Sequence, residues 1–141
     1  MKISRTVAYA VQALLQLSAV PDGRPVACGR LAAEGHMPER FLLQVLRSLV
    51  ESGILRSVRG VDGGYLLDRD PAEVSLLEIV QAFEHSNGPL VPDLEGLPDY
   101  AQQQLLIAMA RVADAEREQL SRVSMADLRP ASPPASPPAT P

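Results

Sequence analysis

Residues 38–67 read PERFLLQVLRSLVESGILRSVRGVDGGYLL, and this stretch decides the fold. Its first half predicts an amphipathic helix from Pro38 to about Glu51, because apolar residues recur three and four positions apart. Pro38 suits the first turn of such a helix, and Gly53 is a stop signal. The apolar stripe consists of Leu42, Val45, Leu46, Leu49 and Val50. The opposite face carries Arg40, Gln44 and Arg47, with Leu43 among them.

The second half of the stretch predicts a β-hairpin. Residues 54–58 are β-prone, residues 59–64 form a glycine-rich turn, and residues 65–67 make the return strand. The dipeptide Asp62-Gly63 is expected to supply the positive φ angles that such turns need. Arg59 then lies at the tip of the hairpin, next to Gly60, on a loop with few bulky side chains.

Two helices are predicted before this stretch. Ser4 is a good N-cap for a helix running to about Val20, and a second, short helix covers about Cys28–Glu34. The order helix, helix, turn, amphipathic helix and hairpin is that of a winged helix-turn-helix. In that fold the third helix enters the major groove of DNA, where Arg can bond guanine and Gln can bond adenine. An arginine at the hairpin tip suits a narrow minor groove, and Lys2 and Arg5 can reach phosphates.

A long helix is predicted after the hairpin. Residues 75–78 form a capping box for a helix ending near Glu84, and residues 85–97 are a loop. The helix that follows, about Pro98–Val123, is roughly 40 Å long, more than a small head can cover. Its apolar stripe favours a dimer seam over a ligand pocket, although a seam can hold one. The predicted seam residues are Leu106, Met109, Ala113 and Leu120.

These elements predict a mainly α fold with a small β-hairpin wing. We expect a DNA-binding domain at residues 1–84, a linker at 85–97 and a dimerisation helix at 98–128. Residues 129–141 are rich in proline and are predicted to be a disordered tail.

Composition agrees with a DNA-binding head. Residues 1–67 hold eight basic and five acidic residues, a net charge of +3, whereas residues 68–141 hold five basic and twelve acidic residues, a net charge of −7. A basic head with an acidic body suits an anionic partner at the head only. The chain has neither a signal-peptide core nor a long uncharged apolar run, so a cytoplasmic protein without membrane contact is expected. No catalytic constellation is present, and an enzyme is not expected.

The detailed sequence resembles the IscR, NsrR and CymR regulators, the Rrf-two family. The start at 1–4, the run 38–46, the hairpin 57–67 and the run 74–80 carry the resemblance closely, and 123–128 resembles the segment that ends the family's dimer helix. It implies a homodimer whose long helices pair and whose two wings straddle a palindromic operator. Many members place three cysteines in the loop corresponding to residues 85–105 to bind an iron–sulfur cluster, and this chain has none there. Leu43 stands where a sensing member carries a glutamate.

No cofactor and no metal site are therefore predicted, since the only cysteine, Cys28, lies elsewhere and a cluster needs several thiolates. Cys28 is either a small buried hydrophobe or a thiol whose pKa the helix N-terminus lowers for a redox role. The leading interpretation is a sequence-specific regulator that acts as a repressor on double-stranded DNA. The alternative is a winged-helix module that docks a partner protein. A small effector or partner enzyme replacing the cluster is compatible with the leading interpretation.

Overall fold

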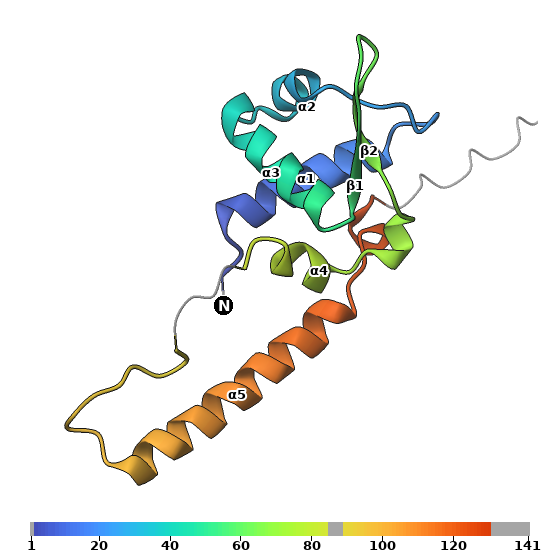
Figure 1. Cartoon of the computed structure of the whole chain (residues 1–141). Helices are drawn as coiled ribbons and strands as arrows, with labels where there is room; N and C mark the ends of the chain where they lie inside the picture. Colours follow the sequence, from blue (N-terminus) through green and yellow to red (C-terminus); the bar gives the residue numbers. More distant parts are fainter. Residues whose placement is uncertain (1, 85–88, 131–141) are drawn as a thin grey trace, which may run out of the picture.

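The computed structural model describes residues 2–84 and 89–130 (Figure 1). The helices and strands within these residues are α1 (Arg5–Ser18), α2 (Cys28–Gly35), α3 (Glu39–Glu51), β1 (Leu55–Val58), β2 (Gly64–Leu67), the 3-10 helix η1 (Pro71–Glu73), α4 (Leu76–Gln81), α5 (Asp99–Ser121) and the 3-10 helix η2 (Ala126–Leu128). Figure 1 shows α1 to α4 and the hairpin gathered into one head, from which α5 extends away.

Helices α1, α2 and α3 build the core of the head. The Ser4 hydroxyl oxygen accepts a hydrogen bond from the Val7 N–H at 3.2 Å, which caps α1 as the sequence predicts. Helix α1 ends at Ser18 rather than near Val20. Its buried residues meet the apolar stripe of α3, of which all but the half-buried Val50 is buried. The fully buried side chains from these helices include Ala10, Ala13, Leu14, Leu31, Leu42, Leu46 and Leu49.

Strands β1 and β2 form the predicted antiparallel hairpin, with Leu55 paired to Leu67 and Val58 to Gly64. A third segment joins the sheet, because Val26 and Tyr65 exchange two backbone hydrogen bonds of 2.9 Å each. The loop before α2 therefore lies along the outer edge of β2. The element order and the hairpin confirm the predicted fold class, a mainly α winged helix-turn-helix.

The prediction that Asp62 and Gly63 supply the positive φ angles of the turn is wrong. Positive φ occurs at Gly60, at 119°, and at Gly64, at 152°. The five residues between the strands are too many for a two-residue turn, so the positive φ angles fall at Gly60 and at the start of β2. Gly64 also lies where β2 meets the third segment, and a Cβ there would collide with the Val26 carbonyl oxygen. Glycine is required at that contact.

The chain returns to the head after α5. Ser75 and Glu78 form the predicted capping box, although α4 ends at Gln81 rather than near Glu84. The Leu76 N–H donates to the Val123 carbonyl at 2.7 Å, and the Met125 N–H donates to the Val74 carbonyl at 2.9 Å. Because this short pairing fixes residues 123–125 beside the start of α4, α5 is attached to the head at its C-terminal end.

Met125 reinforces this attachment. Its side chain is 1% exposed and belongs to the same apolar core as α1 and α3. The Ser124 hydroxyl oxygen accepts from the Asp127 N–H at 3.3 Å, as expected for a residue that caps a last turn. The segment after α5 is thus part of the head rather than a continuation of the long helix.

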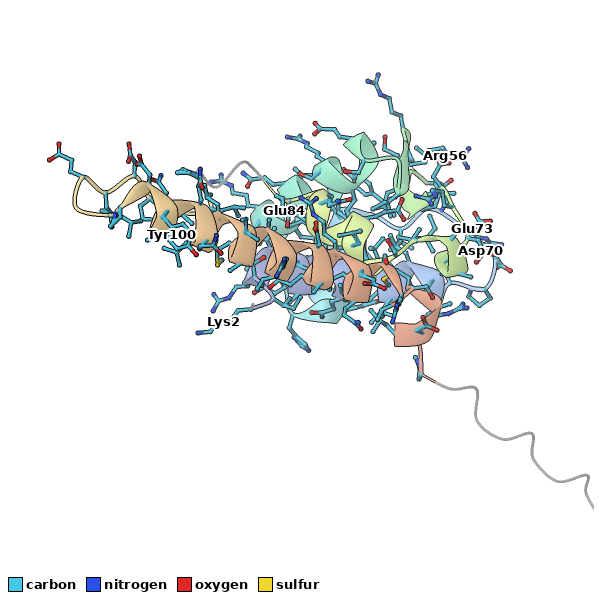
Figure 2. The ribbon with its side chains drawn as sticks, turned by 90° about the horizontal axis from the view of Figure 1, so that it is seen from below. Lys2, Arg56, Asp70, Glu73, Glu84 and Tyr100 are labelled. Atoms are coloured by element: carbon cyan, nitrogen blue, oxygen red, sulfur yellow. The ribbon has the colours of Figure 1, made fainter. Side chains whose placement is uncertain are left out.

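Helix α5 is the most exposed part of the chain. Its 23 residues make a rod of about 34 Å. None of its residues is buried, and Tyr100 at its far end is 73% exposed. Figure 2 shows Tyr100 far from Arg56 of the hairpin, at the other end of the molecule. Within the described residues no helix has the length and apolar character needed to cross a lipid bilayer.

The attachment of α5 can be tested by removing the Met125 side chain. Met125→Ala should lower the free energy of unfolding by about 2–5 kcal/mol, because it leaves a cavity in the core. Leu128→Ala, three residues later on a side chain that is 37% exposed, should cost much less. Chemical denaturation of both variants measures the difference. Equal losses for the two would show that Met125 is not a core residue.

Candidate nucleic-acid interface

The outward face of α3 carries the polar side chains that the sequence singled out. Arg40, Gln44 and Arg47 are all exposed, and Leu43 is half-buried among them. Positions 40, 44 and 47 are four and three residues apart, so they share one face of the helix. The core-facing residues of α3 hold this face outward. It therefore presents two guanidinium groups and one amide along a single line.

A shallow groove separates α3 from the hairpin. Its lining includes Arg47, Val50 and Glu51 from the helix and Ser57, Arg59 and Tyr65 from the hairpin. The structure thus brings Arg47 and Arg59, predicted from separate motifs, to the same groove. Glu51 is an acidic residue on its wall. Two cations on one concave surface make it attractive to a phosphate backbone.

The tip of the wing is open. Arg59 and Gly60 are exposed, and a side chain at Gly60 would meet nothing within 4 Å. Val61 is fully exposed. A thin tip with little bulk can enter a narrow groove, and the positive φ of Gly60 sets the direction of the chain just after Arg59.

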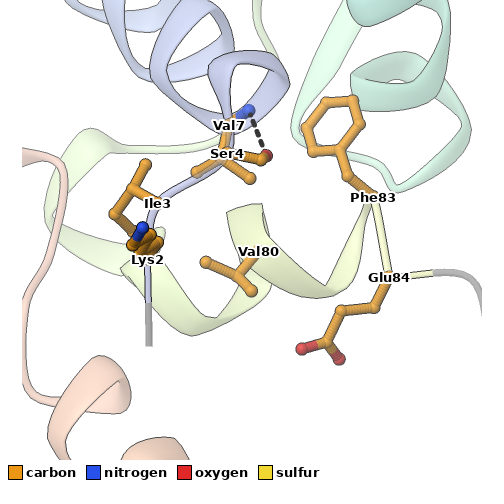
Figure 3. Close-up of a pocket in the computed structure, with 7 residues that line it drawn as sticks. All are labelled: Lys2, Ile3, Ser4, Val7, Val80, Phe83 and Glu84. Carbon is orange, nitrogen blue, oxygen red and sulfur yellow. Dashed lines mark hydrogen bonds between the residues drawn. The ribbon is translucent and has the colours of Figure 1, made fainter. Parts of the chain in front are cut away.

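Lys2 and Arg5 lie elsewhere on the head. Both are exposed, but Lys2 lines a cavity of about 220 Å³ formed by the start of α1 and the end of α4. Figure 3 shows Lys2 and Ile3 on one side of Val80, with Phe83 and Glu84 on the other. In Figure 1 the N-terminus lies at the opposite side of the head from the wing tip. The structure does not bring Lys2 to the groove that Arg47 and Arg59 share.

Two basic residues beside the wing were missed by the sequence interpretation. Arg24 and Arg30 line a separate groove with Val26 and with Asp62 and Gly63 of the hairpin turn. They precede the hairpin by at least 25 residues, and the pairing of Val26 with Tyr65 places them next to it. The sole sequence signal was their contribution to the basic charge of residues 1–67.

Cys28 is half-buried at the start of α2, where its thiol donates to the Glu39 carbonyl across a distance of 3.7 Å. Burial, and secondarily the negative charge of Glu39, raise the pKa of this thiol above its usual value. The hypothesis that the helix N-terminus lowers the pKa is therefore wrong. Desolvation of the thiol and the charge of Glu39 both disfavour the thiolate at this position.

The predicted dimer residues have different surroundings. Leu106 and Met109 are 39% and 40% exposed, whereas Ala113 is half-buried and Leu120 is packed against the core of its own head. Neighbouring apolar side chains on α5 are exposed as well. They are Leu105, at 45%, Ile107, at 46%, and Val112, at 51%. Leu105, Met109 and Val112 share one helix face, and Ile107 lies about 200° from Leu105 around the axis.

No group of three or more His, Cys, Asp and Glu side chains within residues 2–84 and 89–130 is placed to hold a metal ion. His36 is the C-cap of α2, with a φ of 53°. His85 lies outside the described residues. The only thiol of the chain, that of Cys28, donates a hydrogen bond to the Glu39 carbonyl within the head.

The model of one protein family, described as Rrf2, iron-dependent transcriptional regulator, matches residues 3–130 of this chain. The chain belongs to the Rrf2 family. An HTH-type transcriptional regulator of Synechocystis sp. is 36% identical over 75% of this chain and 67% of its own length. The HTH-type transcriptional regulator CymR of Bacillus subtilis is 30% identical over 91% of this chain and 89% of its own length.

Solved structures agree with this assignment. The structure of T. potens IscR superposes with a TM-score of 0.68 at 27% identity, covering 91% of this chain and 85% of that one. Regulators from Mycobacterium tuberculosis are matched over 54% of their length, so the chain spans about half of those relatives. The family and its relatives are transcriptional regulators, which confirms the winged helix-turn-helix and the prediction that the chain is not an enzyme.

The iron in the family's description does not fit the donor set of this Rrf2 chain. An iron–sulfur cluster is held by several thiolates, and the single Cys28 is half-buried between α2 and α3. The described part of the loop before α5 offers only the carboxylates Asp93 and Glu95.

The raised pKa of Cys28 predicts a slow thiol. In the folded protein at pH 7, alkylation by iodoacetamide should be slower than that of a free thiol, because only the thiolate reacts. Its rate should still rise steeply at pH 9, near the usual pKa of the group. The same protein unfolded in guanidinium is the control and should react at the free-thiol rate. A folded protein that reacts at that rate at pH 7 would contradict the shift.

Proposed function

We propose that this Rrf2-family chain is a homodimeric, sequence-specific regulator that represses transcription by occupying a palindromic operator. The observation that carries the proposal is the shared groove of Arg47 and Arg59, where the exposed face of α3 meets the wing. The groove supports one continuous DNA contact from helix to hairpin. The protein requires no iron–sulfur cluster of its own for this binding, and it works where DNA is, in the cytoplasm.

The division of roles follows from shape. Helix α3 presents Arg40, Gln44 and Arg47 to the major groove, where Gln44 is placed to read adenine and the arginines guanine or phosphate. The half-buried Leu43 offers an apolar surface on the same face. Arg59 follows the hairpin into the adjacent minor groove, whose negative potential is concentrated where the groove is narrow. Gly60 keeps the tip thin. Lys2 and Arg5 are proposed as phosphate contacts only.

Two copies are needed for a palindromic site. Helix α5 leaves the head with Leu105, Leu106, Met109 and Val112 exposed, and a second α5 is the natural cover for such a stripe. Ala113 adds a small residue that allows close approach. Leu120 belongs to the attachment of α5 to its own head and contributes to the dimer by positioning the helix. A dimer of this kind carries two heads, one for each half-site.

The protein-docking alternative makes a different prediction about the same side chains. A wing that docks a protein has no need of an exposed arginine at its tip, or of a second arginine in the groove behind it. Selection of a defined operator from a random duplex library supports the regulator. Failure to enrich any duplex would support the docking module. A small effector or a partner enzyme remains the proposed source of control.

The DNA contacts can be tested by titrating the selected operator. Gln44→Ala should cost about 1–3 kcal/mol and relax preference at one base position, because a specific base contact is lost. Arg59→Ala should weaken binding most at operators with A·T-rich flanks. Gln103→Ala and Arg117→Ala are matched controls on exposed positions of α5 and should bind as wild type. If Arg59→Ala also binds as wild type, the wing assignment is wrong.

The dimer can be tested on the two faces of α5. Met109→Asp should give a monomer that no longer binds the full operator, because it places a charge in the apolar seam. Ile107→Asp is the matched control: its side chain is equally exposed but faces away from the seam, so this variant should stay dimeric. Light scattering at micromolar concentration measures both. A monomeric wild-type protein, or dissociation by both variants, would rule out this seam.

A further inference from the structure

The wing is bordered by two grooves, and only one of them belongs to the interface described above. The second groove lies beside the loop between α1 and α2 and is lined by Arg24, Val26, Arg30, Asp62 and Gly63. It shares no lining residue with the groove of Arg47 and Arg59. Val26, one of its lining residues, exchanges two backbone hydrogen bonds with Tyr65, so the position of the groove relative to the hairpin is fixed. The hairpin therefore has arginine side chains in the grooves on both of its flanks.

A hairpin in the minor groove has a sugar–phosphate strand on each side. Arg47 and Arg59 can meet the strand that also borders the major groove occupied by α3. We infer that Arg24 and Arg30 hold the other strand, as positioning residues that contact phosphate and read no base. The inference rests on the proposed function and deepens it, because it makes the wing a two-sided clamp.

Arg24 and Arg30 form exposed ion pairs that a DNA phosphate can replace. Arg24 lies 3.6 Å from an Asp22 carboxylate oxygen, and Arg30 lies 2.9 Å from one of Glu34. All four side chains are more than half exposed. Exposed ion pairs contribute little because water and salt screen them. A phosphate offers each guanidinium a bidentate partner in their place, with release of condensed counterions from the DNA.

Asp62 offers a second test of this groove, in which the expected change in DNA affinity has the opposite sign. It lies on the turn of the hairpin, in the same groove as Arg24 and Arg30. The Asp62 carboxylate repels a phosphate that enters this groove. Asp62→Asn removes that repulsion at almost unchanged size, so it should strengthen DNA binding at low salt. An unchanged affinity would show that no phosphate enters the groove.

The experiment measures the salt dependence of binding to the selected operator and to a random duplex of equal length. Arg24→Ala and Arg30→Ala should each reduce the slope of log K against log salt by about 0.9, and the double variant by about 1.8. Affinity should fall by the same factor on both duplexes, because phosphate contacts carry no sequence information. Thermal unfolding should be unchanged, since both side chains are exposed.

Arg122→Ala is the matched control. Arg122 pairs with Glu118, four residues before it, at exposures close to those of the Arg30–Glu34 pair, and it lines neither of the grooves beside the wing. This variant should keep the wild-type slope. A wild-type slope in the Arg24/Arg30 double variant would overturn the inference while Arg59→Ala still weakens binding. Loss of base preference in the double variant would overturn it too. Absence of any selected operator would instead defeat the proposed function.

Discussion

The exchange of two backbone hydrogen bonds between Val26 and Tyr65 is the constraint on which the arrangement of the head depends. An isolated two-stranded hairpin is marginally stable in water. Here a third segment pairs with β2 and holds the hairpin upright against α1 to α3. Gly64 makes this approach possible, because any larger residue would collide with the Val26 carbonyl. The direction of the wing, and with it the distance between Arg59 and Arg47, follows from this contact.

The same contact explains how a protein with a net negative charge can bind DNA. The net charge of the chain is −4, but the side chains around the wing come from three separate segments that are richer in arginine than the rest. Folding brings the loop before α2, the end of α3 and the hairpin together at one end of the head. The acidic residues of α5 line neither of the two grooves beside the wing. The basic side chains are therefore gathered by the fold, because they come from separate segments of the sequence.

Local pattern predicted the elements well, and tertiary contacts account for what it missed. The N-cap of α1, the capping box of α4, the stripe of α3 and the hairpin depend on neighbours within a few residues, so the sequence displays them directly. The positive φ angles, the position of Arg24 and the raised pKa of Cys28 depend on Val26, Tyr65 and Glu39, which are distant in sequence. The predicted stripe of α5 mixed exposed residues with Leu120, because periodicity shows a face but not what covers it.

The backbone pairing of residues 74–76 with residues 123–125 joins two parts of the head that are separated in sequence by the segment that carries α5. Helix α5 extends away from the core, and the chain after it returns to a fixed point within the head. The length and chemistry of this intervening segment can change in evolution while the DNA-binding head folds as before. The closure needs only that residues 74–76 and 123–125 meet, so it places no demand on the sequence of the loop between α4 and α5.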